Sequence, residues 1–415
     1  MIRKFLLPLF LLFSIVSFAQ DGSASPYSFF GVGDVRFKGT NEINAMAGLS
    51  IAPDSIHLNI QNPASYSGLK LSTFTIGGSS SATNFKSNTS NDKANRIALD
   101  YFAIGLPLKK FGVALGLIPY ATTGYNIKTI DNVNDIIRRY TGKGGLNKVF
   151  AGIGYQFTPS LSLGADFMYN FGRIETDNIK YVAASQFGTE ETNVSDMSGF
   201  NINIGAMYNH KINKKLDFYS GITYTPQSNL NTNNSRNIFT IQYLGDLTPA
   251  PIDYFNTQSS LNKIKLPSKL SIGAGLGESK KWLFGAQVTF QESSTFSNRL
   301  SDITNVKYEN AVKYTLGGYY IPNYSSFSNY FKKVTYRGGF RYENTGLIIN
   351  NEPINDYAMT AGIGLPIGGS FSNINLGIEL GKRGTTKANL VQENYANIII
   401  SLSLNDKWFV KRKYD

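Results

Sequence analysis

Apolar and polar residues alternate from Leu69 to the C-terminus, in segments of about ten residues. The stretch Leu161–Phe171 is the clearest case. Its odd-numbered positions hold leucine, alanine, phenylalanine and tyrosine, and its even-numbered positions hold mainly serine, glycine, aspartate and asparagine. Because successive side chains of a strand point to opposite faces, this pattern predicts β-strands that are apolar on one face and polar on the other.

The number of alternating segments and the lengths of their connections indicate how the strands are arranged. About fourteen segments of this kind begin near Leu69, Arg96, Phe111, Leu146, Leu161, Gly199, Leu216, Ser268, Trp282, Val306, Val334, Asp356, Ser372 and Tyr395. Short connections such as Leu108–Lys110 alternate with longer ones such as Thr129–Gly145 and Ser228–Pro267, although Ile321–Lys333 is longer than a short turn. This alternation is typical of outer-membrane barrels, whose short turns face the periplasm.

We therefore predict an all-β protein, a transmembrane antiparallel β-barrel of about fourteen strands that spans residues 68–415. An even number of strands places both termini on the periplasmic side of the outer membrane. Alternation alone does not decide which face of each strand points inward, and a water-soluble sandwich with its apolar faces packed together is the competing fold.

The first residues of the chain differ from the rest. Residues 1–19 carry Arg3 and Lys4, then an apolar run, then the small residues Ser17 and Ala19, which together predict a cleaved signal peptide. A retained membrane anchor is the alternative, but the run is short for a membrane span. Residues 20–67 lack a clean period and contain many apolar and small residues, which favours a hatch packed inside the barrel over a disordered leader.

Composition and charge fit the same class of protein. The chain has 40 Gly, 25 Tyr and 28 Phe, and only 16% of its residues are charged, as expected when rings face lipid and small residues face a lumen. There is no Cys, which excludes disulfides and thiolate metal sites. The formal net charge of +12 is spread over turns and the C-terminal tail, so we predict contact with lipid headgroups and no nucleic-acid partner.

Two short motifs carry a resemblance to a known family. The small-residue run Asn44–Gly48 is followed by Asn62, Pro63 and Ala64 and then by the first strand. This order resembles the FadL-like (OmpP1/FadL/TodX-type) outer-membrane transport proteins, in which a hatch that ends in an Asn-Pro-Ala motif fills a fourteen-stranded barrel. Asn62, Pro63 and Ala64 are thus the expected hatch hinge, since proline fixes its own φ and restrains the preceding residue. The many Tyr and Asn residues and the basic tail also resemble outer-membrane proteins of Bacteroidetes.

The third predicted strand contains a proline. Pro119 follows a run of apolar alternation, and proline cannot donate a hydrogen bond to a sheet. The resemblance implies a kinked third strand that opens the wall sideways, and we assign this opening to Pro119 and Tyr120. A proline just beyond the membrane, where strand pairing has ended, explains the same residues equally well.

Five charged residues fall on the polar, inward face of their strands. The set is Asp100, Asp166, Arg337, Arg341 and Glu379. Charge on the lipid face would be costly, so these side chains are expected to line the lumen. They could bind the carboxylate of a cargo molecule, but ion pairs that hold hatch and wall together are the favoured interpretation.

Catalytic and metal-binding patterns are weak in this sequence. The two histidines, His57 and His210, lie far apart, so a metal pair is not predicted. The glycine-rich stretch Gly273–Gly277 lies in an alternating segment rather than before a helix, which favours small lumen residues over a phosphate loop. We expect no enzyme activity, no metal and no cofactor.

Two functional hypotheses follow. By the FadL resemblance, the barrel takes up hydrophobic small molecules such as fatty acids by passive lateral diffusion, with outer-membrane lipid and the cargo as its partners. Alternatively, it is a structural or accessory barrel subunit of a larger outer-membrane complex for protein secretion or barrel assembly. Stable protein partners favour the second hypothesis, and bound lipid alone favours the first.

Overall fold

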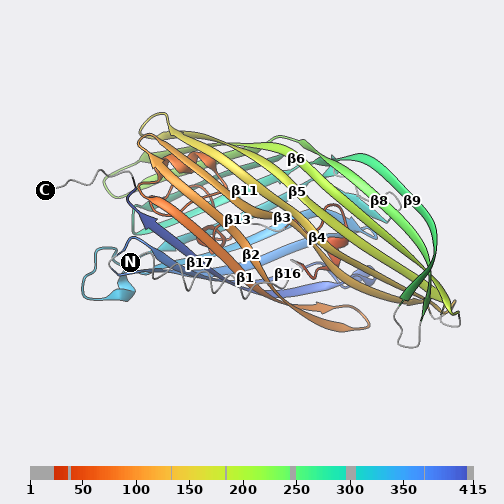
Figure 1. The fold of residues 1–415 in the computed structure, drawn as a ribbon. Coiled ribbons are helices and arrows are strands. Elements are labelled where there is room, and N and C mark those ends of the chain that lie inside the picture. Colours follow the sequence, from red (N-terminus) through yellow and green to blue (C-terminus); the bar gives the residue numbers. More distant parts are fainter. Residues whose placement is uncertain are drawn as a thin grey trace, which may run out of the picture.

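The computed structural model describes residues 23–35, 39–131, 133–182, 185–243, 249–295, 305–368 and 370–408. Residues 1–19, predicted as a signal peptide, lie outside the described residues. Long tilted strands wind around a common axis and form a closed wall, inside which the described residues that precede the first strand are folded (Figure 1).

The wall is a single antiparallel sheet of seventeen strand segments. These are β1 (Ser72–Lys86), β2 (Asn91–Leu108), β3 (Phe111–Asp131), β4 (Ile136–Gln156), β5 (Leu161–Val182), β6 (Phe187–Lys211), β7 (Asp217–Thr225), β8 (Ser228–Tyr243), β9 (Pro249–Leu266), β10 (Lys269–Glu278), β11 (Trp282–Gln291), β12 (Val306–Tyr308), β13 (Ala311–Tyr320), β14 (Thr335–Ile349), β15 (Glu352–Pro366), β16 (Asn373–Arg383) and β17 (Gln392–Asp406).

Three of the passes across the wall are interrupted strands. β7 and β8 both pair with β6 and so form one pass. β8 pairs with β9 and β7 pairs with β10, so β9 and β10 form the next pass. β12 and β13 both pair with β14 and form the third. Pro226 and Pro267 occupy the first two breaks, where a residue without an N–H cannot continue the ladder. The sheet is therefore a closed antiparallel barrel of fourteen strands, which confirms the predicted fold class. β1 closes the circle by pairing with β17, from Ser72↔Asp406 to Lys86↔Gln392.

The two ends of the barrel differ. We call the end that carries the turn between β2 and β3 and the last described residues the short-turn end, and the opposite one the long-hairpin end. At the long-hairpin end most of the predicted loops are strands: β3 reaches Asp131 and β4 begins at Ile136, and β8 and β9 form a paired hairpin. Alternation stops there because both faces are polar, but backbone pairing between neighbours continues.

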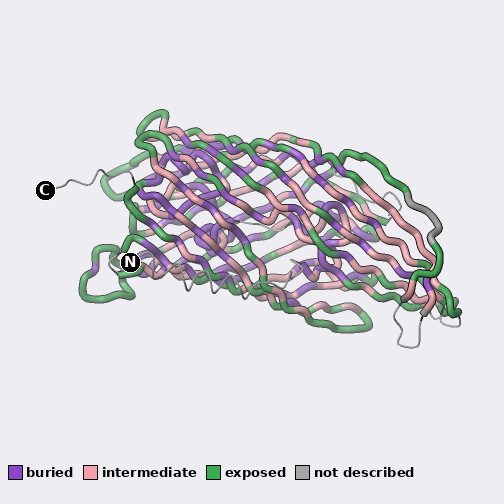
Figure 2. Tube along the Cα trace, in the orientation of Figure 1, coloured by how far each residue is buried: buried purple, intermediate pink, exposed green. Residues whose placement is uncertain are grey.

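Outward and inward faces follow the predicted parity. On β5 and β6 the side chains of Leu163, Phe167 and Ile202 are exposed on the outer surface, whereas Asp166 and Asn203 are buried inside. Figure 2 draws this alternation of buried and exposed positions along the strands. The apolar face is therefore the outer one, as in a barrel that is surrounded by lipid. None of the helices among the described residues is long and apolar enough to cross a membrane.

The described part of the hatch folds into three short helical turns inside the wall: η1 (Pro26–Phe29), α2 (Asn41–Asn44) and η2 (Pro63–Gly68). Figure 1 draws them in red and orange within the barrel. Leu58 and Tyr66 pack with Tyr101 and Phe150 of the wall, and a second cluster joins Leu49 and other hatch residues to Leu283 and Tyr219. Burial of apolar hatch side chains against inward wall residues holds the plug in place.

Candidate functional site

The wall splits between β2 and β3. These strands pair only from Leu108↔Phe111 to Phe102↔Leu117. Beyond that point β2 continues with β1 as its partner, and β3 continues with β4. One edge of each strand is thus left without a neighbouring strand over the half of the barrel nearest the long-hairpin end, and we refer to this gap in strand pairing as the opening.

Pro119 and Tyr120 lie where the opening starts. The register between β3 and β4 shifts between Pro119 and Ala121, so Tyr120 is an extra, bulged residue. The bulge reverses the faces of β3: Ala114 and Ile118 are buried before it, and Ala121 and Thr123 are buried after it. A bulge bends its strand and increases the local twist, which separates β3 from β2. Whether molecules pass here stays a prediction.

The N-terminal segment, residues 23–34, occupies the edge of β3 that faces the opening. Asp34 and Thr122 form an antiparallel bridge with two backbone hydrogen bonds, of 2.8 and 3.1 Å. Two residues further along, Gly124 N donates to Ser28 Oγ at 3.1 Å, and Ser28 Oγ also lies 3.2 Å from Gly124 O. The backbone N–H and C=O groups of Thr122 and Gly124 have no partner on β2, and the chain's own N-terminal segment forms their hydrogen bonds instead.

The same segment is held by charged residues from other parts of the wall. Asp34 forms a buried ion pair with Arg383 of β16, with 2.5 Å between Oδ1 and Nη1. Ser25 donates to the carboxylate of Glu393, and the Tyr27 hydroxyl donates to the carbonyl of Val391. The segment thus runs between the free edge of β3 and the β16–β17 hairpin.

The expected hinge residues form the start of η2. Asn62 caps this helix through Ala64 N, which donates to Asn62 Oδ1 at 3.1 Å, and its Nδ2 donates to Ala206 O at 3.2 Å. Pro63 stands at the first helical position, where its missing N–H costs nothing. The motif therefore anchors the end of the hatch to the wall at β6, and its movement as a hinge stays a prediction.

Glycines of the wall make room for this anchor. A Cβ at Gly112 would lie 1.8 Å from Tyr66 O, one at Gly164 would lie 2.4 Å from Pro63 C, and one at Gly205 would lie 2.1 Å from Asn62 Oδ1. Any larger residue at these positions would push η2 out of its place. Part of the high glycine content is thus explained by close approach between hatch and wall.

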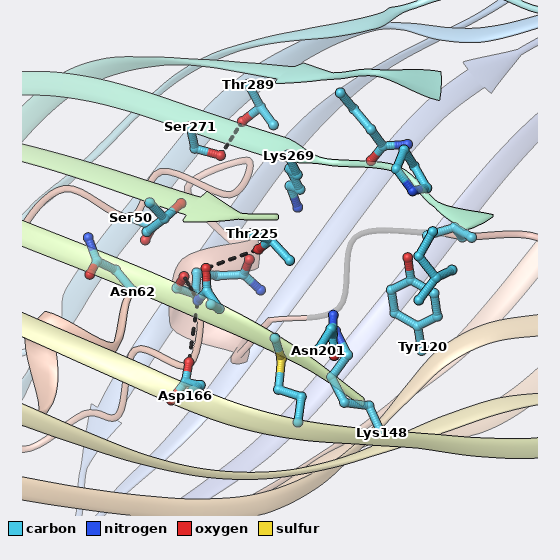
Figure 3. A pocket seen from close by; sticks show the side chains of 18 of the residues that line it. Ser50, Asn62, Tyr120, Lys148, Asp166, Asn201, Thr225, Lys269, Ser271 and Thr289 are labelled. Atoms are coloured by element: carbon cyan, nitrogen blue, oxygen red, sulfur yellow. Dashed lines mark hydrogen bonds between the residues drawn. The ribbon is translucent and has the colours of Figure 1, made fainter. Parts of the chain in front are cut away.

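A cavity of about 180 Å³ lies in the lumen beside the bulge. Pro119, Tyr120 and Lys148 line it on one side and Lys269 on another, and Figure 3 shows Lys148 and Lys269 extending into it. The Lys148 ammonium lies 4.4 Å from the centre of the Tyr120 ring. Many of the other lining residues are polar, among them Ser271 and Thr289, whose hydroxyls are 2.9 Å apart. A space lined in this way is suited to water and polar groups.

The five predicted lumen charges are all buried inside the barrel. The structure does not bring them into one site. Asp166 accepts from Asn203 Nδ2 at 3.3 Å beside the cavity, Asp100 accepts from Ser79 at 3.0 Å, and Arg337 donates to Asn375 Oδ1 at 3.3 Å.

Arg341 and Glu379 form an ion pair with each other, with 2.6 Å between Nη1 and Oε1. Arg341 also donates to the Tyr395 hydroxyl at 2.9 Å and lies 3.5 Å from Asp356. These partners come from neighbouring strands, so the network joins wall to wall rather than hatch to wall.

His57 of the hatch forms a second charged cluster. Its Nδ1 lies 2.9 Å from Asp54, and its Nε2 lies 3.9 Å from Glu42. Burial alone would lower the pKa of His57, but the Asp54 carboxylate outweighs this and raises the pKa above its usual value. Burial would likewise raise the pKa of Asp54, but the charge of His57 and a hydrogen bond to it hold the pKa below its usual range.

Sequence reasoning missed the residues that close the wall. Asp34, Ser28, Arg383 and Glu393 come from segments far apart in the chain, and neither their spacing nor any motif joins them. The glycines at inward positions of β3, β5 and β6 were a usable signal for hatch contacts. Among the residues that the structure describes, no group of three or more His, Asp or Glu side chains could hold a metal ion.

The plugged fourteen-stranded barrel has the fold of the FadL/TodX-type outer-membrane transporters, as its similarity to their solved structures shows. The Ralstonia pickettii toluene transporter TbuX is 14% identical, with a TM-score of 0.60 over 88% of this chain and 97% of its own. The Pseudomonas putida toluene transporter TodX is 14% identical, with a TM-score of 0.59 over 90% and 98%. A Pseudomonas aeruginosa FadL homologue is 11% identical, with a TM-score of 0.58 over 89% and 99%. At these identities the likeness concerns the fold.

The family itself is identified by sequence. A family model described as BamG matches residues 1–415, so the chain belongs to the BamG family. A comparison with curated proteins finds no match. The protein is thus an outer-membrane β-barrel of FadL-like fold within the BamG family.

Proposed function

We propose that this protein is an accessory barrel subunit of an outer-membrane machine that assembles other β-barrels. The observation that carries the proposal is the closure of the wall opening by the chain's own N-terminal segment, through the Asp34–Thr122 bridge and the Asp34–Arg383 ion pair. Membership of the BamG family supports it, because that name points to the barrel-assembly (Bam) machinery.

A barrel closed by its own N-terminal segment resists sideways passage of molecules. Passage through the wall requires the backbone bonds at Thr122 and Gly124 and a buried ion pair to break together. Breaking a buried pair leaves an uncompensated charge and costs about 3–5 kcal/mol. The lumen behind the opening carries lysines, which suits a hydrophobic cargo poorly. A closed, rigid barrel is better suited to support neighbouring proteins in the membrane.

The orientation and partners are part of this proposal. The short-turn end faces the periplasm, as in bacterial barrels of known orientation, and both termini of the mature chain lie on that side of the membrane, after a signal peptide of residues 1–19 is removed. Its partners are outer-membrane lipid and the other subunits of the machine. The protein performs no catalysis and needs no cofactor.

Uptake of hydrophobic small molecules is the second candidate function. It is favoured by the position of the cavity, which adjoins the opening at Pro119 and Tyr120. TbuX and TodX, which share the fold, are toluene transporters. In this case residues 23–34 would have to leave the edge of β3 before cargo could move sideways into the membrane.

The experiment compares association with transport. The tagged protein is purified from its own outer membrane in mild detergent, and its depletion is followed by the amounts of other barrel proteins in that membrane. We expect stable co-purifying outer-membrane proteins and a loss of other barrels on depletion, with uptake of labelled toluene and long-chain fatty acid unchanged. Bound lipid without protein partners, together with lost uptake, would contradict the proposal and support the second candidate.

A further inference from the structure

The connection between β13 and β14, Ile321–Val334, is unlike the other turns at the short-turn end. It is a long ordered loop, whereas β2 and β3 are joined by only Lys109 and Lys110. Ile321 and Val334 are buried and anchor its two ends. Across its neck, Asn323 N donates to Lys332 O at 2.8 Å. We call this segment the aromatic loop.

Polar side chains of the aromatic loop are used for its internal structure. Ser325 N donates to Asn323 Oδ1 at 3.1 Å, and Phe331 N donates to Asn329 Oδ1 at 3.0 Å. Ser326 is buried, and its Oγ accepts from Asn329 N at 3.3 Å. The loop is therefore held in shape by its asparagine and serine side chains, which leaves its rings for the outside.

The outer surface of the loop is aromatic. Phe327 is 98% exposed and Phe331 is 70% exposed, and Tyr324 and Tyr330 are about half exposed. A loop with its polar groups turned inward and its large apolar groups turned outward has the polarity of a binding surface. Aromatic side chains of this kind are the residues that most often supply binding energy in protein interfaces.

The charged residues of the loop itself have one sign. Residues 321–334 contain Lys332 and Lys333 and no acidic residue. Lys333 Nζ lies 5.5 Å from the centre of the Phe327 ring, and Lys280 of the neighbouring turn lies 4.9 Å from that of Tyr324. A complementary partner must therefore offer apolar pockets for the rings and carboxylates for the lysines.

The position of the loop favours a protein over lipid. Trp282, Tyr320 and Tyr336, at the adjacent ends of β11, β13 and β14, mark the level where an aromatic girdle meets the membrane interface. The loop extends from this level past the end of the barrel (Figure 1), and Figure 2 draws most of it as exposed. Phe327 lies about midway in sequence between Tyr320 and Tyr336, so it belongs to the projecting part of the loop.

We propose that the aromatic loop is the docking site for a periplasmic protein partner, which receives Phe327 and Phe331 in an apolar groove rimmed by acidic residues. This inference rests on the proposed function and deepens it, since it assigns the surface through which the barrel joins the larger machine. Lys332 and Lys333 steer the partner and fix its orientation, and the rings provide most of the binding energy.

The test combines co-purification with site-specific crosslinking of the full-length protein in its own membrane. The variant F327S/F331S removes the rings and leaves the internal hydrogen bonds of the loop intact. F157S is the matched control, because Phe157 is 61% exposed in another turn at the same end. We expect F327S/F331S to lower the amount of co-purified protein at least about tenfold, F157S to leave it unchanged, and K332E/K333E to lower it as well. Heat-modifiable migration on gels checks that each barrel is folded.

A photo-crosslinking phenylalanine analogue at position 327 identifies what the loop contacts. We expect a crosslink to a protein segment that is apolar and flanked by Asp and Glu, and no such crosslink from position 157. Crosslinks to lipid alone, or to a basic segment, would overturn the inference, as would a partner retained in full by F327S/F331S. A wild-type protein that co-purifies with no protein at all would instead refute the proposed function.

Discussion

The backbones of Asp34 and Thr122 are joined as if they belonged to neighbouring strands: Asp34 N donates to Thr122 O at 2.8 Å, and Thr122 N donates to Asp34 O at 3.1 Å. In lipid an unpaired strand edge is costly, because no water is present to satisfy its N–H and C=O groups. Residue 34 takes the place that β2 vacates when it separates from β3 at Phe102 and Leu117. Retention of the N-terminal segment and integrity of the wall are therefore coupled.

The first prediction concerns the ion pair that holds this segment. Asp34→Ala leaves the buried guanidinium of Arg383 without its closest carboxylate, which should weaken docking of the segment by about 3–5 kcal/mol. Hydrogen exchange of the amides at Asp34 and Thr122 should then become much faster, while amides of the paired β5–β6 strands keep their protection.

Arg173→Ala is the control for this experiment. Arg173 pairs with Asp196 at 2.7 Å, but both side chains are largely exposed, so its loss should cost at most about 1 kcal/mol and leave the bridge intact. Unchanged protection at Thr122 in the Asp34→Ala variant would show that the backbone bonds alone hold the segment.

The second prediction tests the close contact between hatch and wall. A methyl group at Gly112 would lie 1.8 Å from the carbonyl oxygen of Tyr66, so Gly112→Ala must displace η2. We expect a loss of at least about 1–3 kcal/mol of stability, measured as a lower thermal midpoint of the barrel in detergent. Gly338→Ala is the matched control in β14, where the nearest atom would be 3.8 Å away. Equal midpoints for the two variants would contradict this account of the glycines.

Much of the wall was predictable because its physics is local. Alternation in Leu161–Phe171 reports directly which residues face lipid, since a strand has only two faces. The outer parts of the long hairpins were wrongly predicted as loops. Residues such as 228–243 are mostly polar on both faces of the strand, so they show no apolar–polar alternation. Pairing there is decided by the neighbouring strands rather than by side-chain burial.

The candidate site was harder to predict for a different reason. Pro119 signals by itself that a ladder is interrupted, and the bulge lies beside it. Nothing in the local sequence connects Asp34 to Arg383, which are 349 residues apart. Such contacts depend on the path of the hatch through the lumen. Hatch segments such as Asn44–Gly48 have no alternation of apolar and polar residues from which that path could be predicted.

The third prediction is a pH dependence of hatch stability. His57 is protonated more readily in the folded protein because of Asp54, so its contribution is fully present below the usual pKa of about 6.5 and is lost as the pH rises through the raised folded value. Asp54 has a lowered pKa, so its contribution is present above about 3.8 and lost at lower pH. Glu42, which also faces His57, raises its pKa, and Arg337 lowers it.

The measurement compares thermal midpoints of the wild type and His57→Gln. We expect the wild type to be more stable than the variant below the usual histidine pKa of about 6.5, and the difference to shrink as the pH rises through the raised pKa of folded His57. His210→Gln is the control, since His210 lies at the end of β6 and forms no ion pair with a carboxylate of the residues that the structure describes. A difference between wild type and His57→Gln that does not change with pH would contradict the assigned pair.

The fourth prediction separates a structural role of the lumen charges from a role in binding cargo. Arg341 lies 2.6 Å from Glu379 and 3.5 Å from Asp356, so its charge is already neutralised within the wall. Glu379→Leu should destabilise the barrel by about 3–5 kcal/mol because it leaves a buried cation poorly paired, whereas adding Arg341→Met should recover much of that loss. A double-mutant cycle on thermal or denaturant unfolding should therefore give a coupling of at least about 3 kcal/mol, the upper end of the range for residues in contact. If Arg341 instead served to hold a cargo carboxylate, Arg341→Met would abolish binding of labelled fatty acid while the cycle showed no coupling, because a cargo site gains nothing from a permanent internal partner.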